Sequence, residues 1–228
     1  MEPNNATKLF SPPLYAETEV KQEWIDKTFY VLKVIKKKED YQIDTYCLKN
    51  DIADPSNYHQ SDILAGIEWE RAEETSWKTY QFPSKYKTAS FLRKKDKYAD
   101  LSYPSYFIRL NNEETNAYVM PIETRILRKE FIEIIPRAKY SKVPPAKDEQ
   151  RYALPKDFVI FGFDYIEPFI LCNYLEKNIK FSKRKNEFNR FVDIRKKRGH
   201  PVPLDFIELY KKRRDIVNKI LLDLEKAI

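Results

Sequence analysis

The sequence predicts an α+β protein, with a mostly antiparallel β-rich region up to about residue 165 and a region of about three helices after it. Short β-branched and aromatic segments separated by polar turns fill the first part. In the last part the apolar residues recur at steps of three and four instead. The 228 residues are 42% hydrophobic and 14% aromatic, which is enough to build a continuous core and argues against a disordered chain.

The chain is predicted to divide into three parts. Residues 1–25, with Pro12 and Pro13, are predicted to form an N-terminal arm that lies outside the core. Residues 26–165 are predicted to form the β-rich domain, and residues 166–228 a basic helical region that either stands alone or packs on the sheet as part of one domain.

The β-rich region begins with a predicted hairpin. Its strands are "TFYVLKVI" from Thr28 and the alternating segment "YQIDTYCL", joined by the polar loop "KKKED". Four more strands are predicted from β-branched and aromatic content, at residues 105–110, 117–127, 130–136 and 157–163. Pro121 inside the second of these indicates a sheet edge or a bulge. The segment "SDILAGIEWERAEE" after Ser61 is expected to be a short acidic helix or an irregular linker.

Three helices are predicted in the C-terminal region. "EPFILCNYLEKNIK" is apolar almost all round and has Pro168 where the first turn of a helix tolerates it, so it should be a buried helix. "KRKNEFNRFVDIRKKR" places Phe188, Phe191 and Val192 on one stripe and basic residues on the other face. After a Gly-His-Pro break, Phe206 begins a third amphipathic stripe that runs to the end of the chain.

Several classes of protein are disfavoured by composition. Three glycines leave no glycine-rich phosphate loop, which argues against enzymes that bind nucleotides in that way. Cys47 and Cys172 fit no metal or redox spacing, and two histidines are too few for a zinc site, so no metal and no cofactor is expected. The start of the chain lacks the features of a signal peptide, and no apolar run is long enough to span a membrane, so we expect a cytoplasmic protein with no membrane partner.

Positive charge is concentrated near the C-terminus. The net charge of the chain is +7, but residues 180–219 hold 14 basic and 5 acidic residues, and the remainder has a net charge of −2. Charges that serve only solubility are usually interspersed with the opposite sign. This segregation therefore indicates an anionic partner.

Nucleic acid, either DNA or RNA, is the leading candidate for that partner. The predicted contact residues are Lys183, Arg184, Lys185, Arg190, Lys196, Lys197, Arg198, Lys211, Lys212, Arg213 and Arg214. If the last two helices pack antiparallel around Gly199, these residues share one edge and can grip a phosphate backbone with little regard to base sequence. The protein would then belong to a DNA- or RNA-processing system, such as a nuclease or restriction-type enzyme. A solvated helix surface, or one that binds an acidic protein or a membrane surface, remains the alternative.

His200 provides a second hypothesis, a metal-independent ribonuclease. The basic residues beside His200 would favour its neutral form, which can take a proton from a ribose hydroxyl, while Arg195 would hold the phosphate. The spacing Arg195-x4-His200 ahead of an amphipathic helix resembles the Arg-x4-6-His signature of HEPN-type ribonucleases, over about the last 60 residues. Lys196 stands where that family usually has Asn or Asp. The resemblance implies catalysis by Arg195 and His200, assembled across a homodimer. The alternative is a histidine in a helix-breaking turn that caps the preceding helix.

Other candidate sites have less support. Asp62, Glu68 and Glu70 resemble part of a PD-(D/E)xK nuclease site, but no lysine follows at the required spacing. Aromatic residues interleaved with lysine at 77–86, and the aromatic cluster at 102–107, could contact unpaired bases or could simply fill the core. A third hypothesis is a non-catalytic subunit of a larger assembly, whose proline-rich loops order against partners. The sequence leaves open whether the protein is an enzyme.

Overall fold

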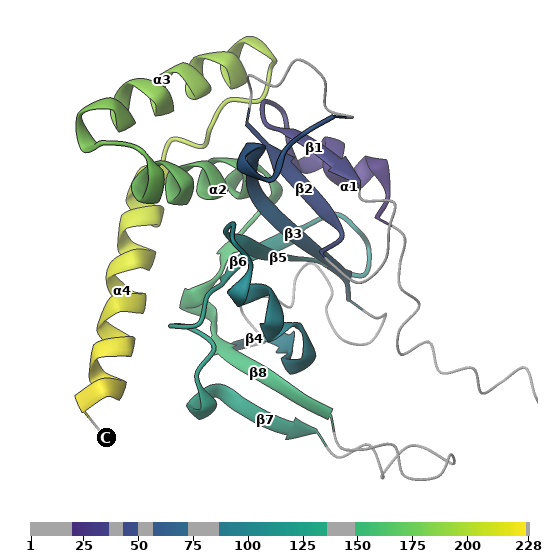
Figure 1. Cartoon of the computed structure of the whole chain (residues 1–228), viewed down its shortest axis with the longest axis vertical. Coiled ribbons are helices and arrows are strands. Elements are labelled where there is room, and N and C mark those ends of the chain that lie inside the picture. The colour runs from purple at the N-terminus through teal and green to yellow at the C-terminus, as the bar shows by residue number, and fades with distance from the viewer. Residues whose placement is uncertain (1–19, 37–42, 50–56, 73–86, 136–148, 227–228) are drawn as a thin grey trace, which may run out of the picture.

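The chain builds three layers, in which helices cover one face of a large sheet and a small sheet covers the other (Figure 1). This computed structural model describes residues 20–36, 43–49, 57–72, 87–135 and 149–226. The α+β class predicted from the sequence is confirmed, with mostly antiparallel strands before residue 163 and the long helices after it.

The large sheet contains six strands in the order β1-β2-β3-β5-β6-β9. The strands are β1 (Lys33–Lys36), β2 (Thr45–Leu48), β3 (Ile63–Arg71), β5 (Ser105–Leu110), β6 (Ala117–Ile122) and β9 (Ile160–Phe161). All neighbours pair antiparallel except β3 and β5, which are parallel. The predicted hairpin is confirmed as β1 and β2, with shorter strands than the sequence pattern indicated.

The small sheet is antiparallel and has the order β4-β8-β7. Its strands are β4 (Thr88–Leu92), β8 (Glu149–Pro155) and β7 (Ile132–Ile135). The two sheets share a core in which the ring of Phe91 on β4 meets that of Phe107 on β5 edge to face, with 5.0 Å between centroids. Such contacts between aromatic rings stabilise the packing of the two sheets.

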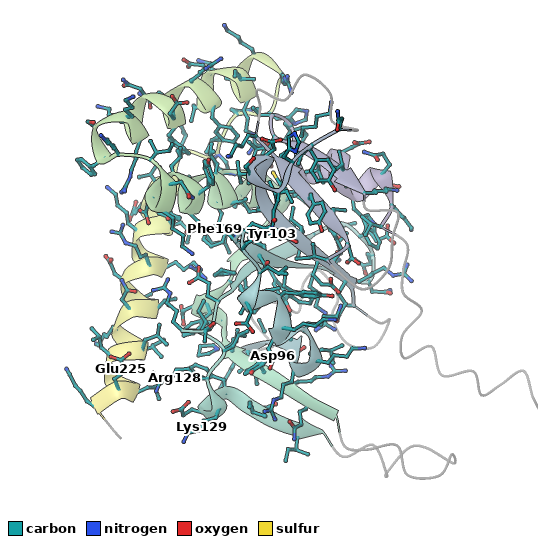
Figure 2. The ribbon with its side chains drawn as sticks, viewed as in Figure 1. Asp96, Tyr103, Arg128, Lys129, Phe169 and Glu225 are labelled. Carbon is teal, nitrogen blue, oxygen red and sulfur yellow. The ribbon has the colours of Figure 1, made fainter. Side chains whose placement is uncertain are left out.

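The helices lie mainly on the face of the large sheet that is opposite the small sheet, and α4 extends from there along the side of the molecule. They are α1 (Gln22–Thr28), α2 (Phe163–Asn178), α3 (Phe181–Lys197) and α4 (Phe206–Lys226). Short 3₁₀ turns are formed by Gln60–Asp62, Arg93–Asp100, Lys129–Phe131 and Lys156–Phe158. Phe169 points from α2 toward the large sheet, where its ring meets Tyr106 edge to face (Figure 2). None of the helices in the described ranges combines the length and apolar character that crossing a membrane requires.

Helix α4 runs along the side of the molecule and contributes to both cores (Figure 1). Phe206 and Tyr210 belong to the core under the helices, and Val217 and Leu221 belong to the core between the sheets. At the C-terminal end of α4, Glu225 lies beside Arg128, with 3.9 Å between its carboxylate oxygen and a guanidinium nitrogen of Arg128 (Figure 2). The predicted amphipathic pattern of this helix is therefore confirmed, and it buries its stripe against two different elements.

Two predictions about the strands were wrong. The segment expected to be an acidic helix or linker is β3, at the centre of the large sheet, with Ile63 to Trp69 buried. A strand covered on both faces has apolar residues on both faces, so it lacks the alternation that marks a half-buried strand. Strands β4 and β8 were not predicted, and the strand expected at 157–163 is a 3₁₀ turn followed by the two-residue strand β9.

Helix α2 begins earlier than the position of Pro168 indicated. It starts at Phe163, so Pro168 lies inside the helix rather than in its first turn. Gly162, with φ of 108°, supplies a backbone conformation before the helix that other residues rarely adopt.

Pro121 of β6 pairs with Tyr106 of β5. On the other side of β6, the short strand β9 pairs only with Tyr118 and Val119. Strand β6 therefore lies inside the large sheet and not at the predicted edge or bulge, although no described strand pairs with Pro121 on the β9 side.

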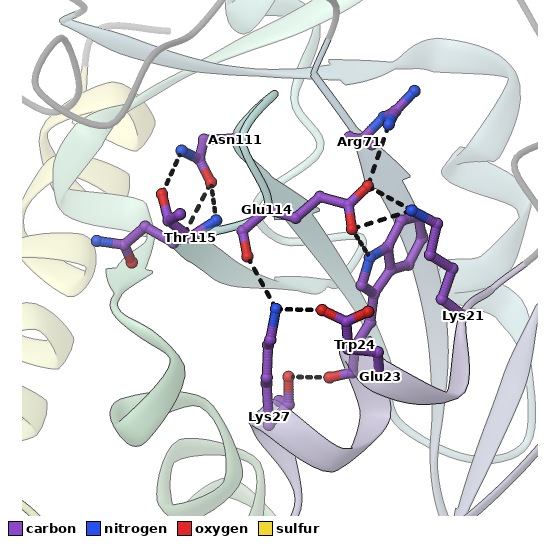
Figure 3. A network of polar contacts seen from close by, with 10 residues as sticks. Lys21, Glu23, Trp24, Lys27, Arg71, Asn111, Glu114 and Thr115 are labelled. Atoms are coloured by element: carbon purple, nitrogen blue, oxygen red, sulfur yellow. Dashed lines mark hydrogen bonds and ion pairs between the residues drawn. The ribbon is translucent and has the colours of Figure 1, made fainter.

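Part of the predicted N-terminal arm is packed. Residues 1–19 lie outside the described ranges, but helix α1 buries Trp24 completely. Figure 3 shows how α1 is tied to the turn between β5 and β6: Glu114 accepts hydrogen bonds from the Trp24 indole, at 2.8 Å, and from Lys21 and Arg71. Glu114 has φ of 55°, and these three side-chain donors help to hold the residue in that left-handed conformation.

Candidate nucleic-acid interface

Helix α3 is the outermost helix, lying over α2 on the side away from the large sheet (Figure 1). Its apolar stripe packs inward, as predicted: Phe191 is buried, and Phe188 stacks against Phe206 at the start of α4 with 6.0 Å between centroids. The remaining sides of α3 face solvent. Most of the polar side chains of this helix are therefore exposed to solvent.

The solvent-facing sides of α3 are strongly basic. We define the α3 surface as the exposed basic side chains of the helix and its two flanking residues, namely Lys180, Lys183, Lys185, Arg190, Lys196, Lys197 and Arg198. Two exposed carboxylates, Glu187 and Asp193, stand among them. Arg198 donates a hydrogen bond to the backbone carbonyl of Tyr30, but none of the other six forms an ion pair with any described residue. The α3 surface therefore carries an excess of positive charge that the described part of the fold leaves uncompensated.

The predicted basic residues of α4 lie elsewhere and are largely compensated. Helix α4 begins beneath α3 and runs away from it crosswise rather than antiparallel beside it, so the two basic blocks do not share one edge (Figure 1). Lys211 and Lys212 are exposed, but Arg214 pairs with Glu176 at 3.0 Å and also lies 3.6 Å from Asp215. Exposed acidic residues on α4 nearly equal the exposed basic ones: Lys211, Lys212, Arg214, Lys219 and Lys226 against Glu208, Asp215, Asp223 and Glu225.

Two of the predicted contact residues are not on the surface. Arg213 is 8% exposed and donates a hydrogen bond from Nε to the carbonyl of Phe158 at 3.0 Å. Burial lowers the pKa of its guanidinium to about 10, although Glu123 opposes the change. Arg184 is half-buried and donates to the carbonyls of Glu176 and Ile179 at the end of α2. These two arginines stabilise backbone carbonyls, so we assign them structural roles.

Arg195 is fully buried, contrary to its predicted role as the group that holds a phosphate. Its guanidinium donates to the backbone carbonyl of Asp164 at 2.9 Å and to the Asp164 carboxylate at 3.3 Å. The Nε atom also lies 3.6 Å from a carboxylate oxygen of Glu167, which is buried too. Burial lowers the pKa of Arg195, while Glu167 and Asp164 act in the opposite direction. Arg195 therefore joins α3 to α2 and has no exposed atom for a ligand.

The burial of both arginines could have been predicted from spacing. Arg195 follows Phe188 and Phe191 at steps of three and four, and Arg213 lies between Tyr210 and Val217 in the same way. Each therefore falls on the apolar stripe of its helix. Counting basic residues along the chain hides this difference, because it ignores the direction in which each side chain points.

His200 is exposed and belongs to the turn that ends α3. Gly199 has φ of 82°, and the N–H groups of Gly199 and His200 donate to the carbonyls of Lys196 and Arg195, which is a Schellman motif. The imidazole stacks on the ring of Tyr30, with 3.7 Å between centroids and an interplanar angle of 10°. The Arg195 guanidinium lies 4.9 Å from the centre of the same ring. Thus His200 and Arg195 both pack on Tyr30, and only His200 is open to solvent.

No family model, curated protein or solved structure matches this chain. What the interface can bind is therefore inferred from its own residues.

The carboxylates considered for a nuclease site are separated by their partners. Glu68 is buried on β3 and pairs with Lys95, while Glu70 lies 3.2 Å from Arg109 and Asp62 accepts a hydrogen bond from the backbone of His59. Burial and the nearby charge of Asp44 raise the pKa of Glu68 to about 7. Within the described ranges, no group of three or more His, Cys, Asp or Glu side chains is arranged to hold a metal ion.

The aromatic cluster at residues 102–107 forms part of the core. Tyr103, Tyr106 and Phe107 are all buried, and Tyr103 meets Tyr46 edge to face with 5.5 Å between ring centroids. These rings pack inside the molecule and are not presented to bases. The second cluster, at 77–86, lies outside the described residues.

Proposed function

We propose that this protein binds nucleic acid through the α3 surface, mainly by contacts with phosphates. The observation that supports the proposal is the uncompensated charge of that surface, with seven exposed cations against two exposed carboxylates on one solvent-facing helix. Phosphate backbones bind such surfaces through Coulomb attraction and the release of counterions, with little dependence on base sequence.

The dimensions of α3 agree with this kind of contact. Its 17 residues extend over about 25 Å, since an α-helix rises 1.5 Å per residue. Phosphates of one strand follow each other about every 3.4 Å along a duplex, so the helix can lie beside about seven of them. The α3 surface has basic side chains near both ends and in the middle of this length, at Lys183, Arg190 and Lys197.

The partner in this proposal is DNA or RNA, and the protein would act in a nucleic-acid-processing system of the cytoplasm. Both thiols, Cys47 and Cys172, are free, as expected of a chain in a reducing compartment. A ribonuclease that uses Arg195 and His200 together is not proposed, because Arg195 has no exposed atom with which to hold a phosphate.

The test compares charge reversal on the two helices. One variant carries Lys183→Glu, Arg190→Glu and Lys197→Glu on α3, and the matched control carries Lys211→Glu, Lys212→Glu and Lys219→Glu on α4. All six side chains are exposed, so neither variant should disturb the core. Binding of labelled duplex and single-stranded oligonucleotides is followed by fluorescence anisotropy at about 50 and 200 mM salt.

We expect the unsubstituted protein to bind with a steep salt dependence. The α3 variant should bind much more weakly, and the slope of log K against log salt should fall by about two to three, because each lost phosphate contact removes about one. The α4 control should keep most of the slope. Equal loss in both variants would show that only net charge matters, and absence of binding at the lower salt concentration would exclude nucleic acid as the partner.

A further inference from the structure

Phe181, the first residue of α3, is an apolar ring held in solvent. Its side chain is 85% exposed, whereas Phe188 and Phe191 of the same helix are partly or fully covered. Burying a phenylalanine side chain typically stabilises a fold by about 1.5–3 kcal/mol. The fold gains almost none of this from Phe181, so the ring is available for contact with a partner.

The position of Phe181 is fixed by the turn between α2 and α3. Arg184, one turn further along α3, donates hydrogen bonds to the carbonyls of Ile179 and Glu176 at 2.7 and 2.6 Å. These are carbonyls at the C-terminal end of α2, where intrahelical donors are lacking. The guanidinium carbon of Arg184 also lies 5.9 Å from the centre of the Phe181 ring. The ring therefore projects from a turn whose backbone is held in place by the hydrogen bonds of Arg184.

The surroundings of the ring are basic. Lys180, Lys183 and Lys185 are exposed and lie within four residues of Phe181 in the chain, and the first turn of α3 contains no acidic residue. A cationic partner would be repelled, and an uncharged apolar partner would gain nothing from the lysines. An exposed aromatic ring beside a row of cations is the combination that binds single-stranded nucleic acid, in which cations hold the phosphates while bases stack on the ring.

Building on the proposed nucleic-acid binding, we propose that Phe181 stacks on an unpaired base, so that the α3 surface binds single strands more tightly than duplex. Bases in a duplex are already stacked on each other, so a ring could reach one only by separating a base step, which costs a few kcal/mol. In a single strand every base offers a free face. The lysines beside Phe181 would contact the phosphates that flank the stacked base.

The test uses three substitutions that separate stacking from apolar contact. Phe181→Ala removes the ring, Phe181→Leu keeps an apolar side chain without a ring, and Phe181→Trp keeps an aromatic ring. Leu222→Ala, which changes an exposed apolar residue of α4, is the matched control. Binding is measured with an unstructured thymidine oligomer and a uridine oligomer of about 12 nucleotides, long enough to cover α3, and with a duplex of the same length.

We expect the Ala and Leu variants to bind single strands about 5- to 150-fold more weakly, the range that corresponds to loss of one base–aromatic stack. Duplex binding should be unchanged in all variants, and the Trp and control variants should retain single-strand affinity. In the Phe181→Trp protein, binding of a single strand should also change the fluorescence of the added tryptophan, whereas binding of duplex should not.

Unchanged single-strand affinity in Phe181→Ala, together with loss of binding in the α3 charge-reversal variant, would overturn the stacking role and leave phosphate binding intact. If the charge-reversal variant also bound normally, the proposed function itself would fail. Vesicles that contain phosphatidylserine are a separate arm of the test. Strong vesicle binding that survives Phe181→Leu and is lost in Phe181→Ala would assign Phe181 to a lipid surface and contradict stacking on a base.

Discussion

The guanidinium of Arg195 donates a hydrogen bond to the backbone carbonyl of Asp164, a residue 31 positions earlier in the chain. That carbonyl stands four residues before Pro168, so it is the acceptor that an N–H at position 168 would use in an unbroken helix. Proline has no N–H, and Arg195 supplies the missing donor. The proline inside α2 and the buried arginine of α3 are therefore two parts of one contact between the helices.

This contact predicts that Arg195 acts on stability. Arg195→Ala should lower the free energy of unfolding by about 3–5 kcal/mol, because it leaves the buried carboxylate of Glu167 without its cationic partner. The measurement is equilibrium unfolding in guanidinium chloride. Arg190→Ala on the exposed side of α3 should change stability by less than about 0.5 kcal/mol. An Arg195→Ala protein of unchanged stability that no longer binds nucleic acid would instead give Arg195 a direct role in binding.

Glu68 predicts a fall in stability between weakly acidic and neutral pH. Burial raises the pKa of Glu68 in the folded protein from its ordinary value of 4.5 to about 7. The folded state then binds the proton more tightly than the unfolded state, so stability should decrease as pH rises through this window and level off above it. The expected decrease from Glu68 is about 1–3 kcal/mol.

Thermal and urea unfolding between about pH 5 and 8 would measure this dependence. Glu68→Gln cannot titrate, so the variant should lose less stability than the unsubstituted protein as pH rises over the same range. If both proteins gave the same profile, the titrating group would have to be another residue.

The network around Glu114 predicts the opposite pH dependence (Figure 3). Burial alone would raise the pKa of Glu114, but hydrogen bonds from Lys21, Trp24 and Arg71 outweigh it and lower the pKa to about 2. The stabilisation is therefore complete above the ordinary value of 4.5 and is lost as pH falls toward 2. Because Lys21 and Arg71 are partly exposed, we expect a contribution of only about 1–2 kcal/mol.

Glu114→Gln should accordingly destabilise the protein near neutral pH, and the difference from the unsubstituted protein should shrink as pH falls below about 4.5. Urea unfolding at several pH values measures this difference. A gap that stayed constant with pH would mean that the glutamine perturbs the turn itself rather than removing a charge.

The helical part of the fold was predictable because its signals are local. Phe188 and Phe191 are spaced at a helical step, as are Phe206 and Tyr210 of the next helix, and α3 ends where the Gly-His-Pro break stands. The missed strands depend on tertiary contacts. β3 is buried by layers on both of its faces. β8 lies between β4 and β7 in the small sheet, although β4 ends at Leu92 and β7 begins only at Ile132.

The candidate interface was predictable in part for a similar reason. The segregation of charge is visible in the sequence and located the basic helix. The sequence could not show that α4 runs away from α3, or that Arg214 faces Glu176 on α2, because both depend on how the helices pack. Phe181 was not singled out, since only its exposure in the folded chain distinguishes it from the other phenylalanines.

Gly66 predicts a steric limit at the centre of the large sheet. A Cβ atom at this position would lie 2.8 Å from a ring carbon of Tyr103 and 2.9 Å from the Cδ1 atom of Ile43. Both neighbours are buried, so they have little room to move. Gly66→Ala should therefore destabilise the protein by about 1–3 kcal/mol, the usual cost of overpacking a core. The measurement is equilibrium unfolding in urea.

A double-mutant cycle distinguishes this clash from a general intolerance of change in β3. In a Tyr103→Leu background the ring carbon nearest the new Cβ is absent, so the added cost of Gly66→Ala should be smaller than in the unsubstituted protein. Gly199→Ala is the matched control, because a Cβ there would meet nothing within 4 Å and the cost comes only from the φ of 82°. That cost is expected to be about 1 kcal/mol in either background. If the Gly66→Ala penalty were equally large with Leu at position 103, contact with the Tyr103 ring could not be its cause.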